Sequence, residues 1–178
     1  LREVAIRDGL TNLYNRRYLE EALDMELVRA RRSSRGLAVV LIDLDKFKAV
    51  NDTYGHDIGD DLLRAVSHVF TGQLRAGDIV CRYGGEEFLF VLPEITMTTA
   101  LARAEQIRLA VRSVVVKHGH QPIGTVTTSV GLAVFPEHGD SSQMLINAAD
   151  TALYRAKARG GDCIEWPGKA EHDRKQAS

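Results

Sequence analysis

The sequence predicts a domain of the α/β class, more narrowly α+β, with a mixed central sheet of about five strands flanked by helices. Three features support this prediction. The uninterrupted apolar run Leu37–Leu44 is typical of a strand buried on both faces. Two apolar runs within Asp78–Leu92 flank adjacent glycines, which indicates a β-hairpin. Amphipathic helical segments separate these strands; the first crossover favours parallel strands, whereas the hairpin provides antiparallel ones.

The composition fits one globular domain. The chain has 178 residues, 44% of them hydrophobic, which is enough for a substantial core. Its formal net charge of −1 argues against a surface for nucleic acid. No apolar run approaches the roughly 20 residues of a membrane span, and no signal-peptide pattern is present. Cys81 and Cys163 lack metal-ligand spacing, so we expect reduced core residues in a cytoplasmic protein.

The two ends of the chain differ from the segment between them. Because the chain begins with Leu1 rather than Met, we expect residues 1–15 to lead in from an upstream regulatory region. Such a region could tether the full-length protein to a membrane. Residues 168–178 are polar and predict a frayed C-terminal tail. The folded domain is therefore expected to span residues 16–167.

Helix signals surround the buried strand. The first helix is expected after Asn15, a good N-cap residue, and ends in the basic run 29–35. That run is interpreted as a solvated face that complements the helix C-terminus rather than as a ligand site. A short helix, Lys46–Tyr54, follows the strand and ends at Gly55. The next helix is expected to open at Gly59-Asp-Asp61.

The second half of the chain alternates helix and strand patterns. The expected elements are a helix at Thr98–Val115, a strand at Thr125–Phe135, a helix at Ser141–Arg159 and a last strand at Cys163–Trp166. The segment His118-Gly-His120 is too short and isolated for a metal site and is interpreted as a loop.

Acidic residues stand at the ends of two predicted strands. Glu86 and Glu87 directly follow the glycine pair 84–85, which can adopt positive φ and lets another group approach the backbone closely. The hairpin alone is equally consistent with an exposed turn carrying solvated acids. The run ending in Asp43 and Asp45 favours a site, because carboxylates at the end of a buried strand are costly unless paired or bound to a cation. If the strands are neighbours, these acids converge on a hard cation, with Mg²⁺ favoured where phosphates add ligands.

The hairpin segment Arg82-Tyr-Gly-Gly-Glu-Glu-Phe88 resembles the signature of the GGDEF family, the diguanylate cyclases. Six further segments are similar to the family in the same order: Asp8-Gly-Leu-Thr-Asn-Leu-Tyr-Asn-Arg-Arg17, Ile42-Asp-Leu-Asp-Lys-Phe-Lys48, Asn51-Asp-Thr-Tyr-Gly-His56, Gly59-Asp60, Thr127-Thr-Ser-Val-Gly131 and Ala149-Asp-Thr-Ala-Leu-Tyr-Arg-Ala-Lys157. The resemblance implies that residues 16–167 form a catalytic domain with a ferredoxin-like core related to the palm of nucleotide cyclases and polymerases. It also implies condensation of two GTP molecules into cyclic di-GMP, with release of two pyrophosphates.

The resemblance assigns roles to particular residues. Asp43, Glu86 and the backbone carbonyl of Leu44 are expected to hold Mg²⁺ or Mn²⁺, and Glu87 either assists deprotonation or shapes the site. Asn51 and Asp60 match the positions that contact guanine, and Lys48 and Lys157 match those that touch the phosphates. The full set of expected substrate-binding residues is Phe47, Lys48, Asn51, Asp60, Gly84, Gly85 and Lys157.

The resemblance also implies partners and regulation. Because each half of the product comes from one subunit, the active species is expected to be a two-fold homodimer. Arg75 and Asp78 match an inhibitory site for the product in the family. Two positions depart from the family. Gly161 stands where an arginine usually helps to hold the triphosphate, and Arg159 is the candidate to replace that arginine in part. Gln106 stands where some members have a second inhibitory arginine. The alternatives are a catalytically weak module that binds GTP or cyclic di-GMP, and a purely structural dimerisation domain.

Overall fold

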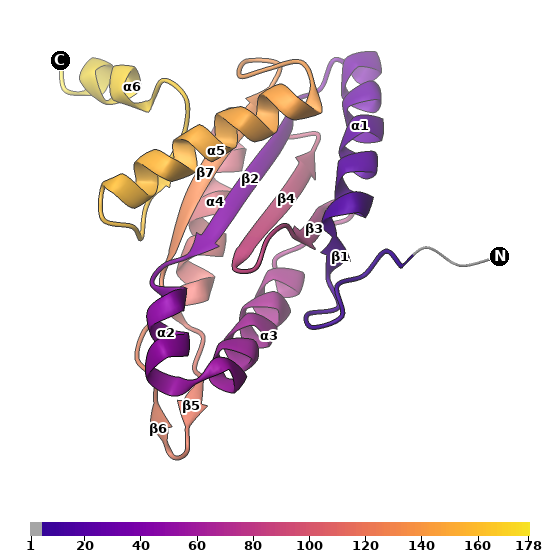
Figure 1. Cartoon of the computed structure of the whole chain (residues 1–178). Helices are drawn as coiled ribbons and strands as arrows, with labels where there is room; N and C mark the ends of the chain where they lie inside the picture. The colour runs from indigo at the N-terminus through magenta and orange to yellow at the C-terminus, as the bar shows by residue number, and fades with distance from the viewer. Residues whose placement is uncertain (1–4) are drawn as a thin grey trace.

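The computed structural model describes residues 5–178, which form a twisted sheet with helices packed on both faces (Figure 1). The helices are α1 (Arg16–Ser33), α2 (Phe47–Tyr54), α3 (His56–Gly72), α4 (Met97–Arg112), α5 (Ser142–Ala158) and α6 (Lys169–Gln176). The strands are β1 (Tyr14–Asn15), β2 (Leu37–Leu44), β3 (Ile79–Arg82), β4 (Glu87–Pro93), β5 (Lys117–His118), β6 (Gln121–Pro122), β7 (Thr128–Phe135) and β8 (Ile164–Glu165).

The main sheet has six strands in the order β1-β3-β4-β2-β7-β8. Strand β2 pairs antiparallel with β4 and β7, β3 pairs antiparallel with β4, and the edge pairs β1–β3 and β7–β8 are parallel. Strands β2 and β3 therefore run in the same direction, with β4 between them. This connection is the split βαβ of a ferredoxin-like fold. The predicted mixed sheet flanked by helices is confirmed, with the edge strand β1 in addition.

The core lies on both faces of the sheet, because alternate residues of each strand point to opposite sides. All eight residues of β2 are buried. On one face, Val40 and its neighbours pack against α3 and α4, where the Phe70 ring meets the edges of Phe88 and Phe90 at centroid distances of 5.0 and 5.1 Å. On the other face, Leu41 and its neighbours pack against α1 and α5. The ends of β2 are thus fixed by contacts from both sides.

Four predictions of secondary structure are wrong, and one of them is the start of β7, which lies at Thr128 rather than Thr125. Helix α3 begins at His56 rather than Gly59, because Gly55, with a φ of 93°, ends α2 and the chain re-enters a helix at once. Helix α4 ends at Arg112, three residues before the predicted end. The predicted loop around His118 is a small hairpin, β5–β6, whose turn contains Gly119 at a φ of 64°.

The C-terminal segment is also more ordered than predicted. Lys169–Gln176 form helix α6 instead of a frayed tail. The helix buries none of its own residues, and its first residue attaches it to the domain. Lys169 Nζ donates to the carbonyl of Ile164 at 2.7 Å and lies 4.9 Å from the centre of the Trp166 ring. A polar composition alone does not predict local contacts of this kind.

Neither cysteine forms a disulfide. Cys81 lies in the core as predicted, where burial raises its pKa to about 12 and keeps the thiol neutral. Cys163 is only partly buried, so the prediction of a core position is wrong for this residue. Within the part of the chain that the structure describes, no helix is both long enough and apolar enough to cross a membrane.

Candidate active site

The end of β2 and the β3–β4 turn bring the predicted acids together. Asp43 lies opposite Glu87 in the register of β2 and β4. The next residue, Leu44, donates its backbone N–H to the carbonyl of Glu86 at 3.2 Å. The turn itself is closed by the N–H groups of Tyr83 and Gly84, which donate to the carbonyl of Glu87 at 2.8 and 3.1 Å. Ordinary sheet pairing therefore fixes the backbones that carry all three acids.

The three carboxyl groups oppose one another's ionisation. Burial, and after it the charge of Asp43, raises the pKa of both Glu86 and Glu87, and Asp150 adds to the effect on Glu87. Burial also raises the pKa of Asp43, although Lys157 partly offsets this. A bound cation would relieve this repulsion, because opposite charge favours the ionised form.

Asp43 has an oxygen that the protein does not fully satisfy. Lys157 Nζ lies 2.7 Å from Asp43 Oδ1, an ion pair without the alignment of a hydrogen bond. Among the described residues, no donor makes an aligned hydrogen bond to this buried oxygen. The Lys157 ammonium compensates the charge of this oxygen. The lysine predicted to touch phosphate therefore contacts the expected metal ligand in the structure.

The donor set fits a hard cation with open coordination positions. Two carboxylates, Asp43 and Glu86, and the backbone carbonyl of Leu44 offer oxygen ligands of the kind that Mg²⁺ and Mn²⁺ prefer. Within residues 5–178, the structure does not gather three His, Cys, Asp or Glu side chains into a complete site. Mg²⁺ commonly takes only one or two carboxylates and leaves further positions to phosphates and water.

The glycine pair leaves space around the turn and does not adopt an unusual backbone conformation. Gly84 and Gly85 are not among the described glycines with positive φ, so that expectation is wrong. A Cβ at Gly84 would lie 2.5 Å from Glu87 Oε2, whereas one at Gly85 would meet nothing within 4 Å. Gly84 thus accommodates an acidic side chain of the site, and Gly85 leaves the outer surface of the turn open.

Sequence reasoning missed two residues that hold this turn. Arg82 donates from Nε and Nη2 to the carbonyl of Gly85 at 3.1 and 2.7 Å. Its Nη1 lies 3.4 Å from the carboxylate of Asp8, whose pKa is lowered because hydrogen bonds from Thr11 and the charge of Arg82 outweigh its burial. Both residues are within the segments quoted above, but 74 residues separate them, and the sequence does not show that they pair.

The expected guanine-contacting residues lie on α2 and α3. Asn51 Oδ1 is buried and has no hydrogen-bond partner among the described residues. A Cβ at Gly59 would overlap this oxygen, so the glycine provides its space, and Phe47 borders the same point. Asp60 is partly buried in the second turn of α3; the first-turn acid is Asp57. Lys48, expected at the phosphates, is exposed.

The two residues of the expected inhibitory site are in contact, but their side chains have different surroundings. Asp78 Oδ2 accepts the backbone N–H of Arg75 at 2.7 Å and lies 2.8 Å from Arg103 Nη1. The Asp78 and Arg103 side chains are only 4% and 5% exposed, whereas Arg75 is exposed. Sequence reasoning missed Arg103, although a charged residue four positions before Ile107, on the apolar face of a predicted helix, is a signal for a buried partner.

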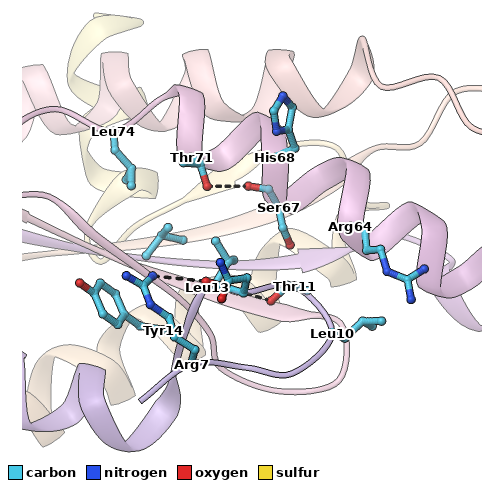
Figure 2. Close-up of a pocket in the computed structure, with 12 residues that line it drawn as sticks. Arg7, Leu10, Thr11, Leu13, Tyr14, Arg64, Ser67, His68, Thr71 and Leu74 are labelled. Carbon is cyan, nitrogen blue, oxygen red and sulfur yellow. Dashed lines mark hydrogen bonds between the residues drawn. The ribbon is translucent and has the colours of Figure 1, made fainter. Parts of the chain in front are cut away.

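A cavity of about 520 Å³ lies apart from the acids, between the N-terminal loop 7–14 and α3 (Figure 2). Several of its polar groups are engaged within the protein. Ser67 and Thr71 donate their hydroxyls to backbone carbonyls of α3 at 2.6 and 3.0 Å, and Arg7 stacks on the Tyr14 ring at 3.9 Å. None of the predicted site residues lines this cavity. The candidate active site is therefore the open surface at the end of β2.

Comparison with known proteins identifies the family. The family model described as "Diguanylate cyclase, GGDEF domain" matches residues 5–163. The chain belongs to the GGDEF domain family of diguanylate cyclases.

Individual relatives agree with this membership. The chain is 41% identical over 164 residues to the response regulator PleD of Caulobacter vibrioides, covering 91% of this chain and 36% of PleD. It is 43% identical over 158 residues to the diguanylate cyclase DosC of Escherichia coli K12, covering 89% of this chain and 34% of DosC. The chain thus spans about a third of the length of these relatives. The crystal structure of the GGDEF domain of DgcB from Caulobacter crescentus, in complex with c-di-GMP, matches with a TM-score of 0.86 at 32% identity, covering 93% of this chain and 97% of that one.

Proposed function

We propose that this domain is a diguanylate cyclase, which condenses two GTP molecules into cyclic di-GMP and releases two pyrophosphates. The convergence of Asp43, Glu86 and Glu87 at the end of β2 carries the proposal. Its family membership and the diguanylate cyclase activity named for DosC support the same conclusion. The cyclic di-GMP bound to the similar DgcB domain supports a guanine-nucleotide ligand.

The metal-binding part of the proposal uses oxygen ligands. Asp43, Glu86 and the carbonyl of Leu44 would hold Mg²⁺ or Mn²⁺. Such an ion supplies Lewis-acid polarisation of the attacking 3′-hydroxyl and neutralises charge on the leaving pyrophosphate. Glu87, opposite Asp43 in the sheet, either accepts the proton of that hydroxyl or shapes the site. Lys157, which forms an ion pair with Asp43, would contact phosphate oxygens next to the ligands.

Substrate binding is proposed for residues on α2, α3 and the hairpin turn. The unpartnered Oδ1 of Asn51 and the carboxylate of Asp60 would accept the N–H groups of guanine. Adenine would leave these groups unpaired, which discriminates by about 10^4 or more in sites of this kind. Phe47, which lies beside Gly59 and Asn51, would border the base, and Lys48 would add charge for the phosphates. The open surface at Gly85 lets the nucleotide approach the turn.

The direct test is incubation of the protein with GTP and Mg²⁺, followed by chromatography for cyclic di-GMP. We expect cyclic di-GMP to form, and an equal concentration of ATP to leave its rate unchanged. Absence of the product from folded, dimeric protein would refute the cyclase proposal. Competition by ATP as effective as added unlabelled GTP would show that Asn51 and Asp60 do not read the base.

One observation favours a second function, that of a module which binds GTP or cyclic di-GMP without turnover. Gly161 supplies no side chain for the triphosphate, and Arg159 is paired with Glu165 at 2.7 Å. Arg159 is therefore engaged at β8, not held free as a substitute. Saturable GTP binding without any product in the incubation above would support this alternative.

We also propose that the product inhibits the enzyme through Arg75. In this proposal the exposed guanidinium binds the ligand, because its planar fork of donors suits phosphate and guanine edges. Asp78, which is buried against Arg103, would hold the shape of the turn. This division of roles differs from the sequence-based expectation that both residues face the product.

Arg75→Ala is expected to retain catalysis and to raise the cyclic di-GMP concentration that halves activity at least about tenfold, or ~1.4 kcal/mol. The reason is the loss of a bidentate charged contact. Product-inhibition curves at matched GTP concentration measure the effect. Arg174→Ala, which removes an exposed arginine on α6, serves as the control. Superimposable curves for Arg75→Ala and the unmodified protein would mean that inhibition acts elsewhere.

A further inference from the structure

Asp45 has no role in the proposed reaction, yet its carboxylate is the centre of a hydrogen-bonded cluster. Thr127 Oγ1 and the backbone N–H of Asp162 donate to Oδ2 at 2.7 and 2.9 Å, and Ser129 Oγ donates to Oδ1 at 2.6 Å. The backbone N–H of Asp45 donates in turn to the carbonyl of Thr127 at 2.9 Å. Both carboxylate oxygens are therefore used within the protein. Asp45 joins three segments here: the end of β2, the start of β7 and the turn after α5.

The turn after α5 is built around this carboxylate. Gly161 has a φ of 79°, and a Cβ added there would lie 2.9 Å from each of three atoms of the Asp45 carboxyl group. Asp162 follows with a φ of 51°. Its own carboxylate lies 2.5 Å from Arg108 Nη1 and 2.5 Å from Arg112 Nη1, both on α4. The residue whose backbone N–H donates to Asp45 is thus held in place by two ion pairs between its own side chain and α4.

This turn directly follows the helix that carries Lys157. Helix α5 crosses the face of the sheet above β2 and β7 (Figure 1) and ends at Ala158. Lys157 is in its last turn. Its Nζ lies 2.7 Å from Oδ1 of Asp43, a residue of β2 that precedes Asp45 by two positions. The cluster therefore holds the two backbone segments that bear this ion pair at a fixed distance. The hydrogen bonds at Asp45 therefore link the residue after β2 to the turn that follows Lys157.

We propose that Asp45 is a positioning residue, which fixes the end of α5 on the end of β2 and thereby holds Lys157 beside Asp43. Its role in catalysis rests on the proposed cyclase function; its role in placing Lys157 does not. The hydrogen bonds, rather than the negative charge, carry this role. An asparagine can reproduce them, with its oxygen accepting from Thr127 and Asp162 and its amide donating to the Ser129 hydroxyl.

The first test compares Asp45→Ala with Asp45→Asn. We expect kcat to fall at least about tenfold in Asp45→Ala and to stay within about threefold of the unmodified value in Asp45→Asn. The Michaelis constant for GTP should change less than kcat, because the guanine-contacting residues lie on other helices. An Asp45→Asn protein as impaired as Asp45→Ala would show that the charge acts directly in the reaction, and would overturn the proposal.

A second measurement is independent of any activity. Lys157 is 41% exposed on its side chain, so an amine-acylating reagent can reach it, and mass spectrometry reports its modification rate. We expect Lys157 to react at least about threefold faster in Asp45→Ala than in Asp45→Asn, because the ion pair with Asp43 loosens. The exposed Lys117 on β5 is the internal reference. Equal rates for Lys157 in both variants would refute the positioning role even if cyclic di-GMP is never made.

Two glycine variants test the same proposal if Asp45→Ala does not fold. Gly161→Ala pushes a Cβ against the Asp45 carboxylate, whereas Gly168→Ala has a similar φ of 82° with nothing within 4 Å of the added Cβ. Both carry comparable backbone strain, and only Gly161→Ala disturbs the cluster. We expect faster modification of Lys157 in Gly161→Ala alone. The same Lys157 rate in these two variants would contradict the proposal.

Discussion

Glu86→Gln is expected to lower cyclic di-GMP formation at least about a hundredfold while the domain stays folded, because the proposed metal site would lose an inner-sphere ligand. The backbone carbonyl of Glu86 accepts from Leu44, so the turn keeps its hydrogen bond when only the side chain changes. Glutamine also keeps the size of the side chain. Product formation by chromatography and thermal unfolding of the same preparation together separate loss of chemistry from loss of structure.

The effect of Glu86→Gln on stability has a definite sign. Burial, followed by the charge of Asp43, raises the pKa of Glu86 in the folded state. Its protonated form thus contributes stability at pH values below the ordinary pKa of a glutamate, and this contribution is lost as pH rises through the folded pKa. Glutamine resembles the protonated form, so at neutral pH the metal-free variant should unfold at the same or a higher temperature. The added stability of the variant over the unmodified protein should disappear in acid.

Glu137→Gln is the matched control, because Glu137 is an exposed glutamate beyond the opposite end of β7 from the acids. It should leave the rate of product formation unchanged. Near-normal activity in a well-folded Glu86→Gln protein would show that this carboxylate is not at the reaction centre. A variant with reduced activity and a lowered unfolding temperature would instead show that Glu86 supports the fold.

The sequence predicted elements whose signals are local. Strand β2 is buried on both faces, so its apolar run is continuous and its two ends are evident. Helix α1 begins where predicted, because the side chain of Asn15 accepts the N–H of Tyr18 at 3.0 Å. Strand β1 was missed because it has two residues and exists only through parallel pairing with β3. A pairing between segments so far apart in the chain leaves no periodic pattern.

The site also contains residues with local sequence signals and residues that depend on distant segments. Acids at strand ends were identifiable because charge next to a buried run is unusual. Their partners were not, because each comes from a distant segment: the N–H of Asp162 meets Asp45 across 117 residues, and Arg103 on α4 meets Asp78, which directly precedes β3. The interpretation of Gly84 as a conformational residue was wrong for a related reason. Its need for space comes from the side chain of Glu87, which the sequence alone does not place.

A hundredfold dilution of the protein below its dimer dissociation constant is expected to lower turnover per subunit about a hundredfold. Each domain offers one Asp43 and one Glu86, and the cyclic product needs two phosphodiester bonds between two nucleotides. Under the proposed function, two loaded domains meet face to face, and the population of such dimers falls with protein concentration. Initial rates across a dilution series, with the dimer fraction measured by analytical ultracentrifugation, test this dependence. Turnover that stays constant through dissociation would place both bonds within a single subunit.

Mixing the unmodified protein with Glu86→Gln tests the same requirement at constant total concentration. If only pairs of intact subunits complete the ring, an equal mixture that exchanges freely retains about a quarter of the activity, since random pairing makes one dimer in four fully intact. Dimers with one intact site should instead accumulate the linear dinucleotide, because one of the two bonds can still form. The Glu137→Gln protein, mixed in the same way, should leave the rate of cyclic product unchanged. Retention of half the activity in the Glu86→Gln mixture would mean that each intact subunit completes the product without an active partner.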